Sequence, residues 1–138
     1  MVNKNLEEGV QLQLSWDKLQ LVAQGRERVL PVVIQDSITK DVLCLAYIHA
    51  EGLRESLRTK RVVLYSTSRQ ETWYKGKTSG DYLELVEVRV NCEQNSLLFL
   101  VRPLGQGVCH TKNSFGKSRK SCFYRRLLAE EKLEFLES

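Results

Sequence analysis

The sequence contains little that would divide the chain into parts. Its 138 residues include only two prolines, and they show no internal repeat, no low-complexity tract and no Pro- or Gly-rich linker. A chain of this length can bury a hydrophobic core without disulfides or structural metals, which become necessary mainly below roughly 40 residues. We therefore expect a single domain, residues 1–138, in which a bound metal would serve function rather than folding.

Long apolar runs are also absent. No window approaches the ~18 apolar residues of a membrane span, and the N-terminal stretch Met1–Glu8 has no apolar core of the kind found in signal peptides. These absences predict a cytoplasmic protein that has no membrane partner.

Charge of neither sign dominates. Lys and Arg number 21 against 17 Asp and Glu, which gives a formal charge of +4 and is compatible with a phosphate-bearing substrate. The most basic stretch is typical of a solvated loop and lacks the regular aromatic partners of a nucleic-acid surface; its cations are Lys112, Lys117, Arg119, Lys120, Arg125 and Arg126. We expect no nucleic-acid partner, and the alternative of a zinc-stabilised nucleic-acid-binding module predicts binding that weakens steeply with salt.

Hydrophobic patterning predicts a mostly β domain of the α+β class. Alternating or β-branched and aromatic runs predict strands over residues 30–36, 42–48, 61–66, 82–90 and 96–104. Ala50, Leu53 and Leu57 are spaced three and four apart and predict a short helix over 50–59 with these residues on its apolar face. Residues 125–134 are predicted to form a second helix.

A long loop dense in hydroxyls, glycines and cations separates the predicted strands 61–66 and 82–90. Glycine lets backbone N–H groups approach an anion, and Lys or Arg supplies charge. The sequence therefore predicts anion binding by Ser68, Arg69, Lys75, Gly76, Thr78, Ser79 and Gly80. Trp73 is a candidate to stack on a base, with a core or interface aromatic as the alternative.

Three of the four cysteines, Cys92, Cys109 and Cys122, lie in short polar contexts, and His110 directly follows the second of them. In a reducing compartment, unevenly spaced cysteines indicate metal binding or catalysis before disulfides. Thiolates suit zinc, and three protein ligands leave one position of a tetrahedral ion open for water. No Cys-x-x-Cys pair is present, so the residues alone leave metal binding and other roles open.

Structural roles are expected for the remaining cysteine and histidine. Cys44 lies in an apolar segment and is expected to be a small buried hydrophobic residue. His49 precedes the predicted helix and is expected at the surface or as a helix cap.

A series of short segments occurs in the order seen in the phosphoribosyl-AMP cyclohydrolases, enzymes of histidine biosynthesis. They are Gln35-Asp36, Leu45-Ala46-Tyr47, Ser66-x-Ser68-Arg69, Trp73-x-Lys75-Gly76-x-Thr78-Ser79-Gly80, Cys92, Cys109-His110-Thr111 and Ser121-Cys122-Phe123-Tyr124-Arg125. The chain resembles this family over about residues 30 to 126.

The resemblance implies hydrolytic opening of the purine ring of 1-(5-phosphoribosyl)-AMP, a phosphorylated nucleotide, between N1 and C6. It implies a pseudo-barrel-like domain with short flanking helices, in an intertwined homodimer that shares its zinc sites, with the ligand roles carried over to Cys92, Cys109 and Cys122. Zinc lowers the pKa of bound water to about 7, and His110 would move protons because imidazole titrates near pH 6.5. The predicted anion-binding loop would hold a substrate phosphate. The helical pyrophosphohydrolase domain of bifunctional relatives is not present, so a single step is expected.

The chain departs from the family pattern around the first zinc cysteine. The family has Asp-Cys-Asp-x-Asp, associated with magnesium, whereas this chain has Asn91, Glu93 and Asn95 around Cys92. Magnesium prefers carboxylate oxygen, so this degenerate site predicts weak magnesium binding, mainly through substrate phosphate.

Two further departures affect the substrate region. The link between Cys109 and Cys122 is longer than in the family, which the slow growth of loop-closure entropy allows. Thr67 stands where the family commonly has Arg, which removes a bidentate phosphate donor. The alternative hypothesis is therefore a family member that acts on another nucleotide, or a nucleotide-binding protein without catalytic activity.

Overall fold

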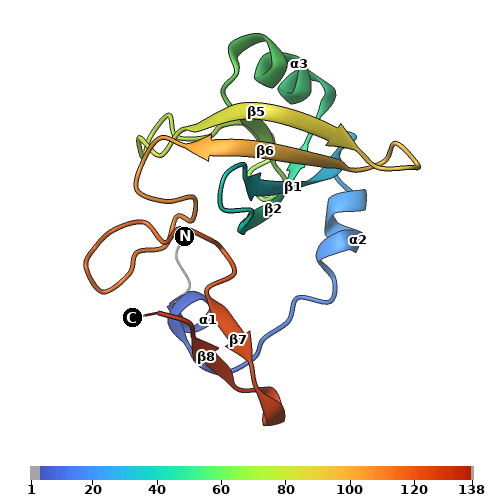
Figure 1. Ribbon diagram of the computed structural model, residues 1–138. Helices are drawn as coiled ribbons and strands as arrows, with labels where there is room; N and C mark the ends of the chain where they lie inside the picture. Colours follow the sequence, from blue (N-terminus) through green and yellow to red (C-terminus); the bar gives the residue numbers. More distant parts are fainter. Residues whose placement is uncertain (1–3, 138) are drawn as a thin grey trace.

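The computed structural model describes residues 4–137 (Figure 1). Residues 1–3, which begin the stretch considered for a signal peptide, and residue 138, the end of the expected domain, lie outside the described residues. The elements are α1 (Lys4–Glu8), α2 (Lys18–Ala23), β1 (Leu30–Asp36), β2 (Val42–Ile48), α3 (Ala50–Thr59), β3 (Val63–Ser66), β4 (Glu71–Tyr74), β5 (Leu83–Val90), β6 (Leu97–Pro103), β7 (Arg125–Leu127), a 3-10 turn (Ala129–Glu131) and β8 (Leu133–Phe135).

Six strands form one curled sheet in the order β4-β3-β2-β1-β6-β5, in which only the β1–β6 pair is parallel. The sheet curls because its β5 edge returns to the segment before β3. The N–H of Val62 donates to the carbonyl of Leu83 at 3.1 Å, and that of Leu85 to the carbonyl of Lys60 at 2.9 Å. The prediction of a mostly β, α+β domain with few short helices is confirmed, and the homodimer stays a prediction.

The core lies inside this curl. Its fully buried side chains come from every strand of the sheet except β4, and they include Ile34, Leu43, Leu64, Leu83 and Phe99. In β1 the buried residues alternate, as expected for a strand with one face inward. The last inward residue, Asp36, ends the strand by accepting hydrogen bonds from the N–H groups of Ile38 and Thr39. The sheet thereby becomes a rigid support for the segments that leave its ends.

Helix α3 has the predicted bounds but buries a different face. Its small residues Gly52 and Ser56 face the sheet, while Leu57 is 46% exposed. The Ser56 hydroxyl donates to the carbonyl of Val63 at 3.1 Å and accepts from its N–H at 2.8 Å. A Cβ at position 52 would meet the Val63 carbonyl at 2.8 Å, so small residues permit this close approach. The expectation of an apolar face through Leu57 is therefore wrong.

His49 is the N-terminal cap of α3, which confirms one of the two alternatives predicted for this residue. Its ring accepts from the N–H of Gly52 at 3.2 Å and contacts the Thr72 hydroxyl at 3.0 Å. The residue is buried, so the alternative prediction of a surface position is wrong.

The predicted helix over 125–134 is wrong. This segment forms the β7–β8 hairpin (Figure 1), in which Arg125 pairs with Phe135. Glu130 and Glu131 in the turn have φ values of 63° and 61°, in the left-handed region, which interrupts a helix. The N-terminal segment also holds the hairpin, since the N–H of Leu133 donates to the carbonyl of Val10 at 2.8 Å.

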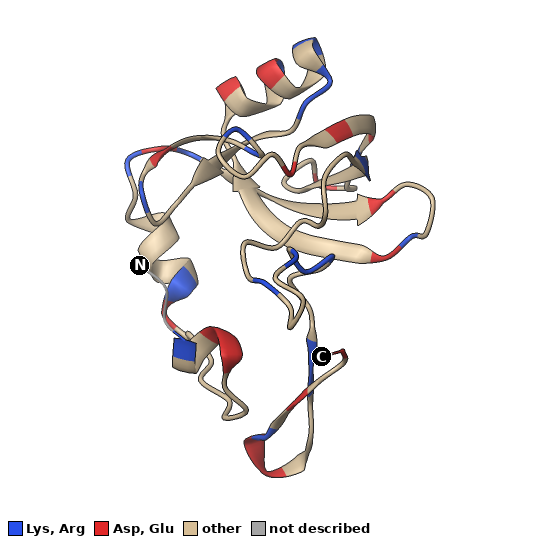
Figure 2. Cartoon of the chain, turned by 90° about the vertical axis from the view of Figure 1, so that its left-hand side faces the viewer, with Lys and Arg blue, Asp and Glu red and all other residues tan. Residues whose placement is uncertain are grey.

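Charges of both signs are interspersed over helices, loops and hairpins in the view of Figure 2, which shows no face of a single sign. Among the described residues, no helix is long and apolar enough to cross a membrane.

Candidate functional site

The segment that carries Cys109 and His110 leaves the end of β6 and runs beside the segment that leads to Cys122. Three backbone hydrogen bonds join them: Val108 N–H to Lys120 O at 3.2 Å, Cys109 N–H to Arg119 O at 3.0 Å, and Arg119 N–H to Thr111 O at 3.1 Å. The extra residues of this link, 112–118, thus form a loop, called the excursion below, whose two ends are joined by these hydrogen bonds. The long link therefore still brings Cys109 and Cys122 together.

Backbone hydrogen bonding also brings a third thiol to this place. The N–H of Cys122 donates to the carbonyl of Leu43 at 2.7 Å, which sets it beside Cys44 on β2. Cys44 is buried, as predicted for a small hydrophobic residue, but its thiol interacts with that of Cys122. No sequence pattern indicates this contact, because Cys44 lies in an ordinary apolar strand.

The thiols of Cys109 and Cys122 are held in their neutral form, whereas hydrogen bonding with Cys122 lowers the pKa of the Cys44 thiol. Hydrogen bonding with Cys122, followed by burial, raises the pKa of the Cys109 thiol well above its usual range. For Cys122, hydrogen bonding with Cys109 lowers the pKa, but hydrogen bonding with Cys44 and burial outweigh this and raise it to about 12. A bound cation would reverse this balance, because a coordinating thiol is deprotonated.

Cys92 lies away from these thiols in the same chain. It is exposed in the turn between β5 and β6, at the start of β6, whereas Cys109 follows the end of that strand (Figure 1). Strand β6 has seven residues, which corresponds to about 23 Å at ~3.3 Å per residue. Within residues 4–137, no group of three or more His, Cys, Asp or Glu side chains is arranged to hold a metal ion.

The residues of the predicted magnesium site build the β5–β6 turn. The side-chain oxygen of Asn91 accepts from the N–H groups of Asn95 and Ser96, each at 2.9 Å, and its NH₂ donates to the side-chain oxygen of Asn95 at 2.7 Å. Glu93 is exposed in the same turn. These amides stabilise the turn, and magnesium binding stays a prediction.

The predicted anion-binding loop is divided by strand β4. Ser68 and Arg69 lie in the β3–β4 turn, and Trp73, which is 40% exposed, lies on β4. The other members, Lys75, Gly76, Thr78, Ser79 and Gly80, follow β4. The four residues of β4 hold the two groups about 13 Å apart. The structure therefore does not gather the predicted set in one place.

Lys75 interacts electrostatically with the thiols. It is buried, and its ammonium donates to the carbonyl of Asp81 at 3.2 Å. Burial lowers its pKa, against the opposing effects of Asp81 and of Cys44, Cys109 and Cys122. Its charge is thus placed to act on the sulfur atoms.

Asp81 ties the Lys75 loop to the excursion between Cys109 and Cys122. One carboxylate oxygen accepts from the N–H of Gln106 at 2.9 Å and the other from the Ser118 hydroxyl at 2.7 Å. Burial raises the pKa of Asp81, but these hydrogen bonds and the charge of Lys75 outweigh it, so the pKa is lowered overall.

We expect Asp81→Asn to lower the free energy of unfolding at pH 7 by about 1.5–3 kcal/mol, the range for hydrogen bonds to a charged group. Because the folded-state pKa is lowered, this contribution is complete above the unfolded value of about 3.9 and is lost as pH falls through the folded value. Urea unfolding of wild type and variant should therefore converge in acid. Glu137→Gln, at an exposed carboxylate, is the matched control; an equal loss for both variants would contradict the role of Asp81.

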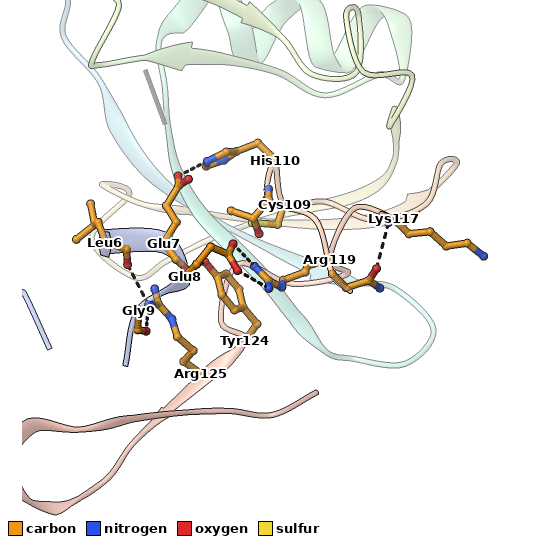
Figure 3. A network of polar contacts seen from close by, with 12 residues as sticks. Leu6, Glu7, Glu8, Gly9, Cys109, His110, Lys117, Arg119, Tyr124 and Arg125 are labelled. Carbon is orange, nitrogen blue, oxygen red and sulfur yellow. Dashed lines mark hydrogen bonds and ion pairs between the residues drawn. The ribbon is translucent and has the colours of Figure 1, made fainter. Parts of the chain in front are cut away.

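His110 is exposed and points away from the thiols toward helix α1, where its Nε2 contacts a carboxylate oxygen of Glu7 (Figure 3). Beside it, the guanidinium of Arg119 is held by Glu8. Arg119 is only 4% exposed, so the prediction of a solvated basic loop is wrong at this residue. Sequence reasoning missed Glu7 and Glu8 because they lie more than a hundred residues away along the chain.

A groove of about 210 Å³ lies next to Cys122. Cys122, Phe123 and Arg125 line one side, and residues of the N-terminal segment, Leu6 and Leu14 among them, line the other. The N-terminal segment is thus part of the surroundings of the candidate site.

Comparison with known proteins relates this site to one family. The model of the family described as phosphoribosyl-AMP cyclohydrolase matches residues 44–124. The chain is 45% identical over 96 residues to the phosphoribosyl-AMP cyclohydrolase of Roseobacter denitrificans, covering 70% of each chain. It is 43% identical over 103 residues to that of Archaeoglobus fulgidus, covering 75% of this chain and 89% of the relative.

Bifunctional proteins also match. The chain is 42% identical over 114 residues to the histidine biosynthesis bifunctional protein HisIE of Thermus thermophilus, covering 83% of this chain and 50% of that protein. The chain therefore spans about half the length of such relatives. The matched segment contains all the cysteines and His110.

Proposed function

Because the chain belongs to the phosphoribosyl-AMP cyclohydrolase family, a family of hydrolases, we propose that it hydrolyses the N1–C6 bond of the purine ring of 1-(5-phosphoribosyl)-AMP in histidine biosynthesis. The observation that carries this proposal is the meeting of Cys109 and Cys122 next to His110, within the segment matched by the family model.

The donor set fits zinc. Two thiols already interact, and thiolate sulfur is a ligand that this cation favours. Cys109 and Cys122 would hold the ion together with Cys92 of a second copy, because Cys92 of the same chain lies in the turn before β6, whereas Cys109 lies beyond the opposite end of that strand. When bound, zinc would lower the pKa of a coordinated water to about 7 and supply hydroxide at neutral pH.

The chain's own residues would handle charge and protons around this centre. Lys75, buried beside the sulfur atoms, would offset the negative charge of the thiolates. His110 would take a proton from the attacking water and return it to N1, the nitrogen that leaves C6. Its exposed ring is positioned to reach a substrate once the contact with Glu7 opens.

The substrate's phosphates would be bound by the loop after β4, where the exposed Thr78, Ser79 and Gly80 offer hydroxyl and backbone donors. Gly80 has a φ of 82°, a conformation that glycine adopts without strain. Ser68, Arg69 and Trp73, across β4, would contact a more distant part of the substrate. Magnesium would bind weakly and mainly through phosphate, because Asn91 and Asn95 bond to each other.

The test is turnover of 1-(5-phosphoribosyl)-AMP by the zinc-loaded protein, followed by ultraviolet absorbance with and without magnesium. We expect ring opening in both conditions with only a modest magnesium response. A folded, zinc-containing dimer that shows no turnover would contradict the proposal. Saturable binding of the nucleotide by that inactive protein would favour the alternative of a non-catalytic family member.

A further inference from the structure

The buried guanidinium of Arg119 is held by an acidic residue of the N-terminal helix. Its Nη1 and Nη2 donate to the two carboxylate oxygens of Glu8 at 2.7 and 2.8 Å (Figure 3). Its Nε is buried and has no hydrogen-bond partner among the described residues. The Arg119 side chain is only 5% exposed, whereas that of Glu8 is 40% exposed. Glu8 therefore covers Arg119 from the solvent side.

Two other basic groups near Arg119 contact the same short segment. His110 contacts Glu7, and Nη1 of Arg125 donates to the carbonyls of Leu6 and Gly9, each at 2.9 Å. Residues 6–9 of the chain thus lie across a basic cluster formed by His110, Arg119 and Arg125 (Figure 3).

This basic cluster borders the candidate metal site. The carbonyl of Arg119 accepts from the N–H of Cys109 at 3.0 Å, and its charged group interacts electrostatically with that thiol. The ring of Tyr124 lies 4.2 Å from the guanidinium carbon. An anion held by Arg119 would therefore lie next to the place where the reaction is proposed to occur.

The site requires an anion but does not specify which one. A buried cation without a counter-ion is strongly unfavourable, so Arg119 needs a partner whenever the chain is folded. The guanidinium fork makes the same pair of parallel hydrogen bonds to a carboxylate and to a phosphate. The buried Nε is a donor that the two oxygens of Glu8 do not satisfy.

We propose that Arg119 and Arg125 form a phosphate subsite, and that Glu8, with Glu7 beside it on His110, occupies this subsite as a displaceable mimic until substrate binds. The inference rests on the proposed function in taking a phosphate of the substrate as the competing anion. Helix α1 has five residues and no buried residue, so its own stability is small.

The chain after α1 provides the anchor about which this segment can move. The N–H of Leu12 donates to the carbonyl of Glu131 at 2.9 Å, and the carbonyl of Val10 accepts from Leu133. Residues 10–12 thus stay attached to the β7–β8 hairpin when residues 6–9 leave the basic cluster. The competing possibility is that Glu8 is only a clasp that fastens the N-terminal segment to the fold.

Phosphate titration of the full zinc-loaded chain, without free metal, separates these possibilities. We expect Glu7→Gln with Glu8→Gln to bind inorganic phosphate on the order of tenfold more tightly than wild type, because the mimic no longer competes. Glu130→Gln with Glu131→Gln, an adjacent exposed pair, changes the net charge equally and should show little tightening. Adding Arg119→Gln to the Glu7, Glu8 variant should abolish the gain.

Equal phosphate affinity in wild type and the Glu7, Glu8 variant would overturn the proposal, most clearly if the variant's melting temperature also fell, as for a clasp. Hydrogen exchange of wild-type residues 4–9 gives a second test that needs no variant. Saturating phosphate should speed their exchange, and unchanged exchange despite bound phosphate would contradict displacement.

The ring-opening assay keeps this proposal separate from the proposed function. Turnover with no Arg119-dependent phosphate binding would contradict the phosphate-subsite proposal and leave the proposed function intact. Arg119-dependent phosphate binding without turnover would contradict the proposed function and would support an anion-binding site.

Discussion

Replacing Cys109 with serine is expected to remove zinc and ring-opening activity together. Cys109 is buried, and its thiol interacts with that of Cys122, whereas a serine hydroxyl is a poor ligand for this ion. Loss of a catalytic metal removes several kcal/mol of transition-state stabilisation, so activity should fall by roughly 10³-fold or more. Metal content per chain and the absorbance assay measure both effects, and full zinc content in the variant would refute the ligand assignment.

Cys44→Ala is the matched control for this prediction. Cys44 is buried and interacts with Cys122, but it is not one of the proposed ligands. The control variant should keep its zinc. Loss of zinc from Cys44→Ala, with retention in Cys92→Ser, would move the third ligand from Cys92 of a second copy to Cys44 of the same chain.

Mixing two inactive variants tests whether the site is shared between copies. Cys92→Ser and Cys109→Ser chains, unfolded together and refolded, should regain activity, because a mixed dimer contains one site with all three thiols. Random pairing makes half of the dimers mixed with one intact site of two, so about a quarter of wild-type activity should return. No recovery, with mixed dimers present, would place all ligands in one chain.

Local patterns were sufficient to predict the centre of the sheet. Strands β1 and β2 and helix α3 have the predicted bounds, because alternation and helical spacing are properties of neighbouring residues. For residues 125–134, local patterns predicted a helix where the structure has a hairpin. Leu127, Leu128 and Ala129 have good helix propensity, but the N-terminal segment supplies a backbone hydrogen bond at Val10 that stabilises a hairpin instead.

The candidate site was predicted only in part for the same reason. Motif order identified Cys109, His110 and Cys122, whose closeness follows from a short ladder of backbone bonds. The surroundings of Cys44 and Arg119 depend on residues 78 and 111 positions away. An apolar strand and a basic run were therefore interpreted by their composition, although tertiary contacts decide what these two side chains do.

His110→Ala is expected to leave zinc bound and to slow ring opening by ~10²-fold or more, the usual contribution of a general acid or base. The exposed imidazole lies next to Cys109 in sequence but contacts Glu7 rather than the thiols, so its removal should not disturb the ligands. Metal content and kcat, measured on the same preparation, separate the two effects.

His110→Gln decides whether the imidazole moves protons or only positions helix α1. Glutamine can still donate to Glu7 but cannot take up a proton near neutral pH. If His110 is the proton carrier, this variant should be as slow as His110→Ala and should lose a limb of the pH profile of kcat. Recovery of the rate in His110→Gln would assign a positioning role to His110, and an unchanged rate in both variants would move the proton carrier to another residue.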